Sequence, residues 1–228
     1  MPKRKQFFIL WVFMILTIAL TVSFSPNAGS IESVPSSGNN SQFLIDLYKA
    51  HYHRATSSYF SRTDINLFVK SLNHDEVIKF FTQFTKNKAI SESIIKWALH
   101  YNVPINLCFA LANTESEGFI PTACGYNRDQ LGRITSIDRG LFQLNSLCFN
   151  LTAQQFFDID TNCNYGIRYL SECLRNTETA PLALIAYNMG LSVAQNGRVP
   201  DMREEYVNKI LAYEAELDMA FNSYAWRK

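Results

Sequence analysis

Residues 104–121 read PINLCFALANTESEGFIP, and their pattern predicts a helix that runs to Glu115. Pro104 stands where a helix can begin, apolar residues follow at helical spacing, and Gly118 ends the pattern. Glu115 lies four residues after Leu111, so its carboxyl group leaves the helix on the apolar face. A carboxyl group on the buried side of a helix end loses hydration, which helps it to keep a proton for a leaving group. Glu115 is therefore the first candidate for a catalytic acid.

The segments on both sides of this stretch are also predicted to be helical. Residues 75–84 combine acidic residues at the start with phenylalanines at helical spacing, which indicates an amphipathic helix. Alternating β patterns are absent except for a short ribbon within 125–138. The fold class is therefore mostly α, with further helices expected at 90–101, 165–174, 181–188 and 204–221.

The composition indicates a compact globular domain that does not bind nucleic acid. Of the 228 residues, 47% are hydrophobic and 18% are charged, which excludes a disordered tail and a coiled coil. The net charge is +1, and once the basic cluster at 3–5 is set aside, acidic residues outnumber basic ones. A protein that binds phosphate backbones would be more basic, so no nucleic-acid partner is expected.

Residues 1–30 have the pattern of an export signal. The basic cluster at 3–5 precedes an uncharged apolar run at 7–24, and small residues follow near Ala28. The run is longer than a usual signal-peptide core and approaches the length that spans a bilayer. Residues 1–30 are therefore either a cleaved signal peptide or a signal anchor, and the positive-inside rule places the rest of the chain outside the cytoplasm.

Domain boundaries follow from changes in composition. Residues 31–40 are rich in Ser, Asn, Gly and Pro, which is typical of a flexible linker. Residues 41–88 are expected to form a helical extension whose pattern indicates no chemistry. Residues 89–228 are expected to form the main domain.

The five cysteines lie close together in the second half of the chain. In an exported protein, such clustering predicts at least one disulfide, although the spacing does not fix the pairing. No Cys-x-x-Cys pair occurs and the four His residues lie outside the cluster, so zinc-site templates do not fit, and neither a metal nor another cofactor is expected. The cysteines are Cys108, Cys124, Cys148, Cys163 and Cys173.

Four short motifs follow one another in an order that is typical of one family. They are Glu115-Ser116 with Phe119-Ile120-Pro121, Asp138-Arg139-Gly140-Leu141-Phe142-Gln143-Leu144-Asn145-Ser146, Asn164-Tyr165-Gly166 with Leu170, and Ala186-Tyr187-Asn188-Met189-Gly190. Over roughly 89–228 the chain resembles the soluble lytic transglycosylase-like (SLT) domain of the lysozyme superfamily. In motif style it is most similar to secretion-associated transglycosylases.

The resemblance implies an α-rich, lysozyme-like fold with a glycan cleft. It also implies an enzyme that cleaves the β-1,4 bond between MurNAc and GlcNAc of peptidoglycan, with a 1,6-anhydro-MurNAc product and no cofactor. The implied location is the bacterial periplasm or cell envelope. The implied partners are peptidoglycan strands, the inner membrane through an uncleaved N-terminal segment, and, as a candidate, an envelope-spanning secretion or motility machine.

The resemblance also implies roles for individual residues of the motifs. By resemblance, Glu115 takes the place of the family's catalytic acid and base, and Gln143 that of the glutamine lining the cleft. Tyr187 and Asn188 match the segment that packs beside the catalytic carboxyl group. The residues expected to bind substrate are Ser116, Gln143, Asn145, Tyr187, Asn188 and Tyr206.

Two further carboxyl groups leave alternatives open. The family's Glu-Ser-x-Phe-x-Pro is one residue shorter than 115–121, so Glu117 is a rival to Glu115, which is favoured for its apolar face and the serine that follows it. Asp138 precedes Gly140 by two residues, as the second carboxylate of C-type lysozymes does, and is either a catalytic assistant or a turn residue. The alternative functions are a lysozyme-like muramidase that hydrolyses the glycan with Glu115 and Asp138, and a peptidoglycan-binding scaffold without catalysis.

Overall fold

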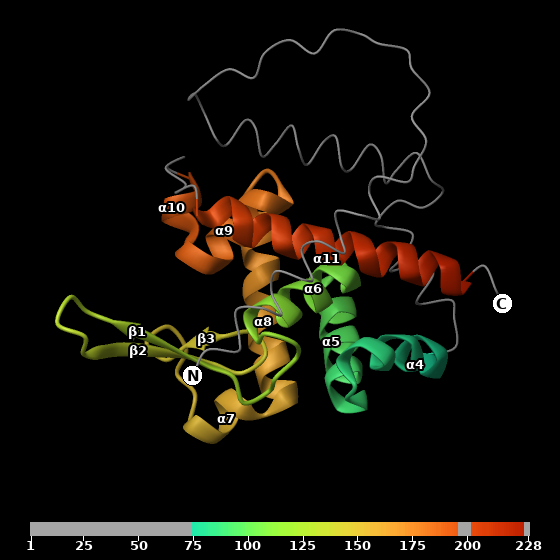
Figure 1. Cartoon of the computed structure of the whole chain (residues 1–228), viewed down its shortest axis with the longest axis horizontal. Coiled ribbons are helices and arrows are strands. Elements are labelled where there is room, and N and C mark those ends of the chain that lie inside the picture. The colour runs from blue at the N-terminus through green and yellow to red at the C-terminus, as the bar shows by residue number, and fades with distance from the viewer. Residues whose placement is uncertain (1–73, 196–201, 226–228) are drawn as a thin grey trace, which may run out of the picture. The chain divides into compact units, whose positions relative to one another are not determined.

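The computed structural model describes residues 74–195 and 202–225 (Figure 1). The expected export signal at 1–30, the linker at 31–40 and most of the extension at 41–88 lie outside the described residues. Within the part that is described, no helix is long and apolar enough to cross a membrane.

The described chain is mainly helical, with one small sheet, which confirms the predicted fold class. The first helices are α4 (His74–Thr85), α5 (Lys88–Tyr101) and α6 (Ile105–Glu115). The strands follow as β1 (Cys124–Arg128), β2 (Ile134–Arg139) and β3 (Leu144–Asn145). The remaining helices are α7 (Ala153–Phe157), α8 (Ile159–Arg175), α9 (Ala180–Met189), α10 (Leu191–Gln195) and α11 (Met202–Ala225).

Helix α6 lies at the centre of the core. Its residues from Ile105 to Ala112 are all buried, as expected for a helix that is apolar on every side. Helix α11 packs along α6, while α5 contacts both α6 and α8, and α9 contacts both α8 and α11. The packing of α6 therefore fixes the position of its last residue, Glu115.

The ends of the helices follow local signals in the sequence. Helix α5 is followed by Asn102 in the left-handed region, with a φ of 54°, and α9 is followed by Gly190, with a φ of 90°. Helix α8 begins after Asp158, whose side chain accepts a hydrogen bond of 2.8 Å from the backbone N–H of Thr161. This start lies before the expected one at 165, so the prediction of α8 was too short.

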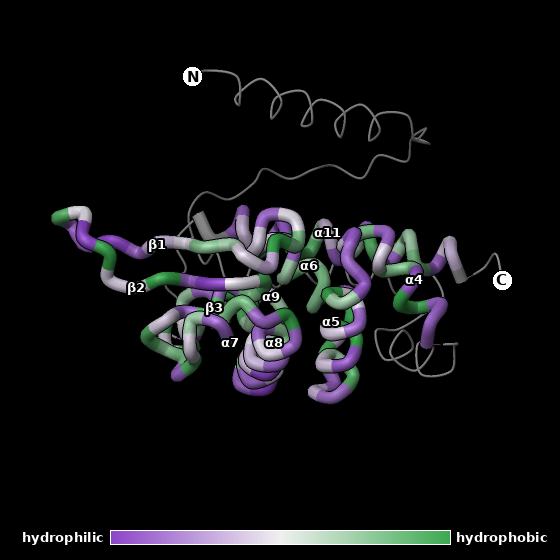
Figure 2. Tube along the Cα trace, turned by 90° about the horizontal axis from the view of Figure 1, so that it is seen from below, coloured by the Kyte–Doolittle hydropathy of each residue, from purple (hydrophilic) through white to green (hydrophobic). Residues whose placement is uncertain are grey.

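The three strands form an antiparallel sheet in the order β1-β2-β3. The predicted ribbon is therefore confirmed, and Figures 1 and 2 show β1 and β2 extending together away from the helices. The register pairs Gly125 with Asp138 and Asp138 with Asn145 across the three strands. Residues from distant parts of the sequence are thereby brought to the base of the ribbon.

The turn between β2 and β3 is fixed against α8 by close contacts with the side chain of Asn162. Gly140 has a φ of 80°, and a Cβ at this position would lie 2.3 Å from Nδ2 of Asn162 and 2.6 Å from the carbonyl oxygen of Phe156. The Asn162 amide group donates hydrogen bonds to the carbonyls of Arg139 and Phe156, and its oxygen accepts one from the N–H of Phe142. No residue other than glycine fits at position 140 without moving this turn.

The predicted disulfide is not found, and all five cysteines are free thiols. Three of them, Cys108, Cys163 and Cys173, are buried on the inner faces of α6 and α8, where they pack as small apolar residues. Cys124 and Cys148 are exposed. Core positions on two helices therefore account for three of the five clustered cysteines, and the clustering does not identify a bonded pair.

Candidate active site

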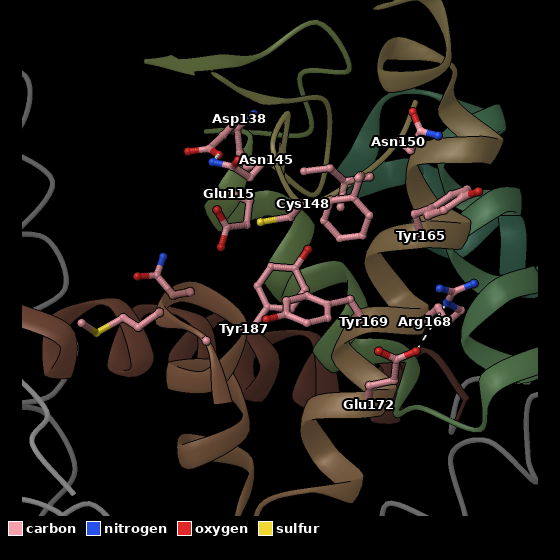
Figure 3. Close-up of a pocket in the computed structure, with 16 residues that line it drawn as sticks. Glu115, Asp138, Asn145, Cys148, Asn150, Tyr165, Arg168, Tyr169, Glu172 and Tyr187 are labelled. Atoms are coloured by element: carbon pink, nitrogen blue, oxygen red, sulfur yellow. Dashed lines mark hydrogen bonds and ion pairs between the residues drawn. The ribbon is translucent and has the colours of Figure 1, made fainter. Parts of the chain in front are cut away.

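A cavity of about 700 Å³ lies between the base of the ribbon and helices α8 and α9 (Figure 3). The predicted site residues that line it are Glu115, Asp138, Gln143, Asn145, Tyr187 and Asn188. The structure thus brings together residues from α6, β2, β3 and α9 and from the turn between β2 and β3. Such a concave site with several polar groups is what a glycan-binding cleft requires.

Glu115 is the last residue of α6 and is half-buried in the wall of the cavity. The phenolic hydroxyl of Tyr206, on α11, donates a hydrogen bond of 2.5 Å to its Oε1 atom. Because α11 packs along α6, this contact joins two rigid elements and fixes the direction of the carboxyl group.

The chain turns away sharply after Glu115, and the rival carboxyl group leaves the cavity. Glu117 and Phe119 have positive φ values of 52° and 63°, with Gly118 between them at 111°. Phe119 is buried, whereas Glu117 is exposed and does not line the cavity. Of the two carboxyl groups, only that of Glu115 therefore faces the cavity.

Ser116 was expected to bind substrate, but it does not line the cavity. Its side chain is fully buried, donates a hydrogen bond of 2.6 Å to the carbonyl of Ala112, and accepts one of 3.1 Å from the N–H of Ile120. Ser116 therefore ties the end of α6 to the following turn and acts on Glu115 through the backbone.

Gln143 lies at the tip of the turn between β2 and β3, with a positive φ of 44°. Its amide Nε2 donates to the carbonyls of Gly140, at 2.8 Å, and Ala123, at 3.2 Å. A Cβ on Gly125 would lie 3.1 Å from Gln143 Oε1, so the absence of a side chain at 125 leaves room for this amide group. The glutamine is thus held by backbone on both sides while it lines the cavity.

The ring of Tyr187 lines the cavity, whereas its hydroxyl group makes a hydrogen bond within the protein. The hydroxyl donates a hydrogen bond of 2.8 Å to the carbonyl of Phe142, which anchors α9 to the turn that carries Gln143. Burial raises the pKa of Tyr187 well above its usual value, and the neighbouring Glu115 carboxylate adds to this. The phenol therefore stays protonated as a fixed donor to the backbone. Asn188, next in sequence, is exposed at the cavity.

Asp138 is a strand residue, so its interpretation as a turn residue was wrong. Its two carboxylate oxygens accept hydrogen bonds from the amide groups of Asn127, at 2.8 Å, and Asn145, at 2.7 Å. Both amide groups also donate to the hydroxyl of Ser136. This network holds Asp138 in place at the cavity, on the same side as Glu115 in Figure 3.

Sequence reasoning missed Asn162, which supports the site without lining it. Its three hydrogen bonds join α8 to the turn that carries Phe142 and Gln143. The sequence did contain a signal for this residue. Asn162 lies four residues before Gly166, as the asparagine does before the glycine in the family's Asn-Ile-x-x-Gly pattern. The interpretation placed that pattern on Asn164, whose oxygen instead accepts a hydrogen bond from the Tyr101 hydroxyl.

The family model of the transglycosylase SLT domain matches residues 92–207. The chain belongs to this family. The matched part of this SLT domain contains both Glu115 and Tyr206, and it confirms the resemblance inferred from the four motifs. No curated protein matches the chain.

One similar solved structure is an inactive mutant of the lytic transglycosylase Slt from Pseudomonas aeruginosa. It is 19% identical in sequence to this SLT domain protein, with a TM-score of 0.45. The match covers 80% of this chain and 34% of that chain, so the protein spans about one third of the length of the Slt structure.

Proposed function

We propose that this SLT domain is a peptidoglycan lytic transglycosylase that cleaves the β-1,4 bond between MurNAc and GlcNAc. The observation that carries the proposal is the placement of Glu115, whose half-buried carboxyl group faces an open cavity and is oriented by the Tyr206 hydroxyl. Membership of the SLT family supports the same reaction class.

In the proposed reaction, Glu115 acts first as an acid and then as a base. Its carboxyl group gives a proton to the glycosidic oxygen, the bond from that oxygen to C1 of MurNAc breaks, and positive charge develops at C1. The resulting carboxylate takes the proton of the C6 hydroxyl on the same MurNAc, and O6 bonds to C1. The products are a 1,6-anhydro-MurNAc end and a free GlcNAc hydroxyl, and Glu115 recovers its starting protonation state.

The other residues of the cavity position the glycan for this step. The NH2 groups of Gln143 and Asn145 already donate within the protein, so these two residues offer their amide oxygens as acceptors to sugar hydroxyl and acetamido groups. Asn188 offers both a donor and an acceptor. The ring of Tyr187 offers an apolar surface against which a sugar face can pack. Held in place by the core, these groups reduce the entropic cost of reaching the reactive geometry.

A hydrolytic muramidase is the second candidate, because Asp138 lines the same cavity as Glu115. An oriented carboxylate could support positive charge at C1 while water attacks. Its two amide donors, Asn127 and Asn145, hold its oxygens in fixed directions. The two enzymes differ in product, since hydrolysis leaves a reducing MurNAc end.

The test is mass spectrometry of the products that the wild-type chain releases from purified peptidoglycan. We expect muropeptides that end in 1,6-anhydro-MurNAc. Reducing ends in their place would assign the hydrolase. Release of neither product, with retained binding of the glycan, would assign a scaffold without catalysis.

We also propose that the domain works outside the cytoplasm, in the periplasm or cell envelope, because peptidoglycan is there. The support in this chain is the export pattern at 1–30, and an uncleaved segment would attach the domain to the inner membrane. A secretion or motility machine that spans the envelope is the partner that would need local wall opening. Cell fractionation with protease protection tests the location, and a cytoplasmic protein with an intact N-terminus would contradict it.

A further inference from the structure

The cavity continues past Glu115, and its far end has a different chemistry. Glu115 and Asp138 lie at one side of it, whereas Tyr165, Arg168 and Glu172, all on α8, lie at the other (Figure 3). Among the described residues that line the cavity, Arg168 is the one Lys or Arg side chain. The cavity therefore has two carboxyl groups at its catalytic side, and its one cation, paired with Glu172, at the opposite side.

A row of aromatic rings connects the two sides. The ring centroids of Tyr187 and Tyr169 are 5.1 Å apart, those of Tyr169 and Phe149 are 6.0 Å apart, and those of Phe149 and Tyr165 are 6.1 Å apart. Sugar faces and apolar peptide side chains pack well on such rings. The row thus provides a continuous binding surface from the reactive bond to Arg168.

The guanidinium group of Arg168 can contact a ligand at the end of this row of aromatic rings. Its guanidinium group lies 5.5 Å from the ring centroid of Tyr165, one turn earlier on α8. Its Nε lies 3.4 Å from Oε1 of Glu172, one turn later, and its side chain is 53% exposed. The contact with Glu172 is made through Nε, so the Nη atoms can still donate to a planar acceptor such as a carboxylate.

We propose that Arg168 is a specificity-determining residue that binds a carboxylate of the peptide substituent on the substrate strand. The proposal rests on the proposed function, because the substrate of that reaction is a strand in which MurNAc carries a peptide. The peptide has free carboxylates, whereas the sugar backbone is uncharged once the lactyl group of MurNAc is bonded to the peptide. A carboxylate is attracted by Arg168 and repelled by Asp138. The charges therefore set the direction in which a peptide-bearing strand enters the cavity.

The test measures binding of three kinds of glycan strand to the full chain carrying Glu115→Gln, so that no strand is consumed. The strands carry intact peptides, or peptides whose carboxylates have been converted to amides, or no peptides, which leaves the lactyl carboxylate of MurNAc free. Arg168→Gln is compared with Arg168→Lys and with Glu172→Gln, and thermal unfolding confirms that each variant is folded.

We expect Arg168→Gln to weaken binding of the intact strands by about three- to tenfold and to leave binding of the amidated strands unchanged. Arg168→Lys should lose less, because it keeps the charge. Glu172→Gln should strengthen binding of the intact strands, since it removes the competing carboxylate. The difference between the intact and amidated strands should shrink at high salt.

Other outcomes overturn the proposal. An equal loss on all three strands would make Arg168 a structural residue, and a loss confined to strands without peptides would assign the lactyl carboxylate instead. Weaker binding of the intact strands by folded Glu172→Gln would also contradict the proposal, because removal of the competing carboxylate should strengthen binding to Arg168. Because binding is measured without turnover, a failure of the transglycosylase proposal itself would be seen separately, in the products of the wild-type chain.

Discussion

The hydroxyl group of Tyr206 donates a hydrogen bond of 2.5 Å to Oε1 of Glu115, although 91 positions separate the two residues in the sequence. The contact joins α11 to the end of α6, and both helices are parts of the same core. A carboxyl group on a half-buried helix end would otherwise be able to rotate. We therefore propose a positioning role for Tyr206, while the substrate-binding role expected from the sequence stays a prediction.

Tyr206→Phe should lower kcat about tenfold and change KM little, because it removes one hydrogen bond to a charged group and no contact with the glycan. Tyr213→Phe is the matched control, since Tyr213 is on the same helix and does not line the cavity. Steady-state kinetics on soluble glycan strands measure both variants. A rise in KM with unchanged kcat would return Tyr206 to substrate binding.

Glu115→Gln should abolish wall cleavage and leave the fold intact. The substitution keeps the shape of the side chain and removes the transferable proton, and a general acid contributes on the order of 10²- to 10⁴-fold to the rate. Glu117→Gln is the matched control two residues away, and should keep most of the activity because Glu117 is exposed outside the cavity. The reverse result would move the acid to Glu117. Dye release from labelled cell walls measures both variants.

Asp138→Asn separates the two proposed reactions. A transglycosylase that needs one carboxyl group should keep substantial activity and still release anhydro-muropeptides. A hydrolase that depends on Asp138 should lose activity by about the factor expected for a catalytic carboxylate, 10²-fold or more. The substitution also replaces one oxygen of Asp138, which accepts a hydrogen bond from Asn127 or Asn145, with an NH2 group that cannot accept it. Thermal unfolding must therefore be recorded with the kinetics.

The fold was predictable where the local sequence determines it. The apolar stretch before Glu115 and the stop at Gly118 predicted α6, and the short alternating pattern predicted the ribbon. The first part of α8 was missed because Ile159–Asn164 is mostly polar, with residues of low helix propensity. The helix forms there because Asp158 caps it and the core covers one face.

The site was predictable only where a residue touches the cavity itself. Glu115 could be placed from its helix face, whereas Ser116 was assigned to substrate because it adjoins Glu115 in the motif. Asn162 escaped notice because two of its hydrogen-bond partners, at 139 and 142, lie 23 and 20 positions away in sequence. Contacts of this kind depend on how the turn and α8 meet in space, which spacing along the chain does not reveal.

Gly140→Ala should destabilise the protein more than Gly132→Ala, although both glycines have similar φ values, of 80° and 76°. The cost that they share is the left-handed backbone, about 1 kcal/mol for a residue with a Cβ. At 132 the new Cβ meets no atom within 4 Å, whereas at 140 it would overlap Asn162 and the Phe156 carbonyl. We expect an additional loss of about 2 kcal/mol at 140. Urea unfolding of both variants measures the difference, and equal losses would show that the turn can move freely.

The thiols provide a further prediction, because the structure has five free cysteines where the sequence predicted a disulfide. In native protein, a thiol reagent should modify the exposed Cys124 and Cys148 and leave the buried Cys108, Cys163 and Cys173 unreacted. After unfolding without reductant, all five should react. Fewer than five reactive thiols in unfolded protein taken from its native compartment would show that a disulfide forms, as the sequence predicted.

The buried thiols should also make the fold sensitive to alkali. Burial raises the pKa of Cys108 and Cys163 well above the usual value, and raises that of Cys173 to about 12. Unfolded thiols ionise near pH 8.5, so the native state binds more protons than the unfolded state above that pH. The contribution to stability is complete below about pH 8.5 and is lost as the pH rises toward the native pKa values.

Each buried thiol should lower the free energy of unfolding by about 1.4 kcal/mol per pH unit above pH 8.5. Cys173→Ala should therefore reduce this slope, whatever its effect on stability at neutral pH, because it removes one of the three buried thiols whose ionisation is suppressed in the native state. Cys124→Ala should not, since Cys124 is exposed in the folded protein. Urea unfolding between pH 7 and about pH 10 measures the slope. A wild-type slope that stays flat through this range would mean that the thiols ionise within the fold, and that the core around α6 and α8 admits water.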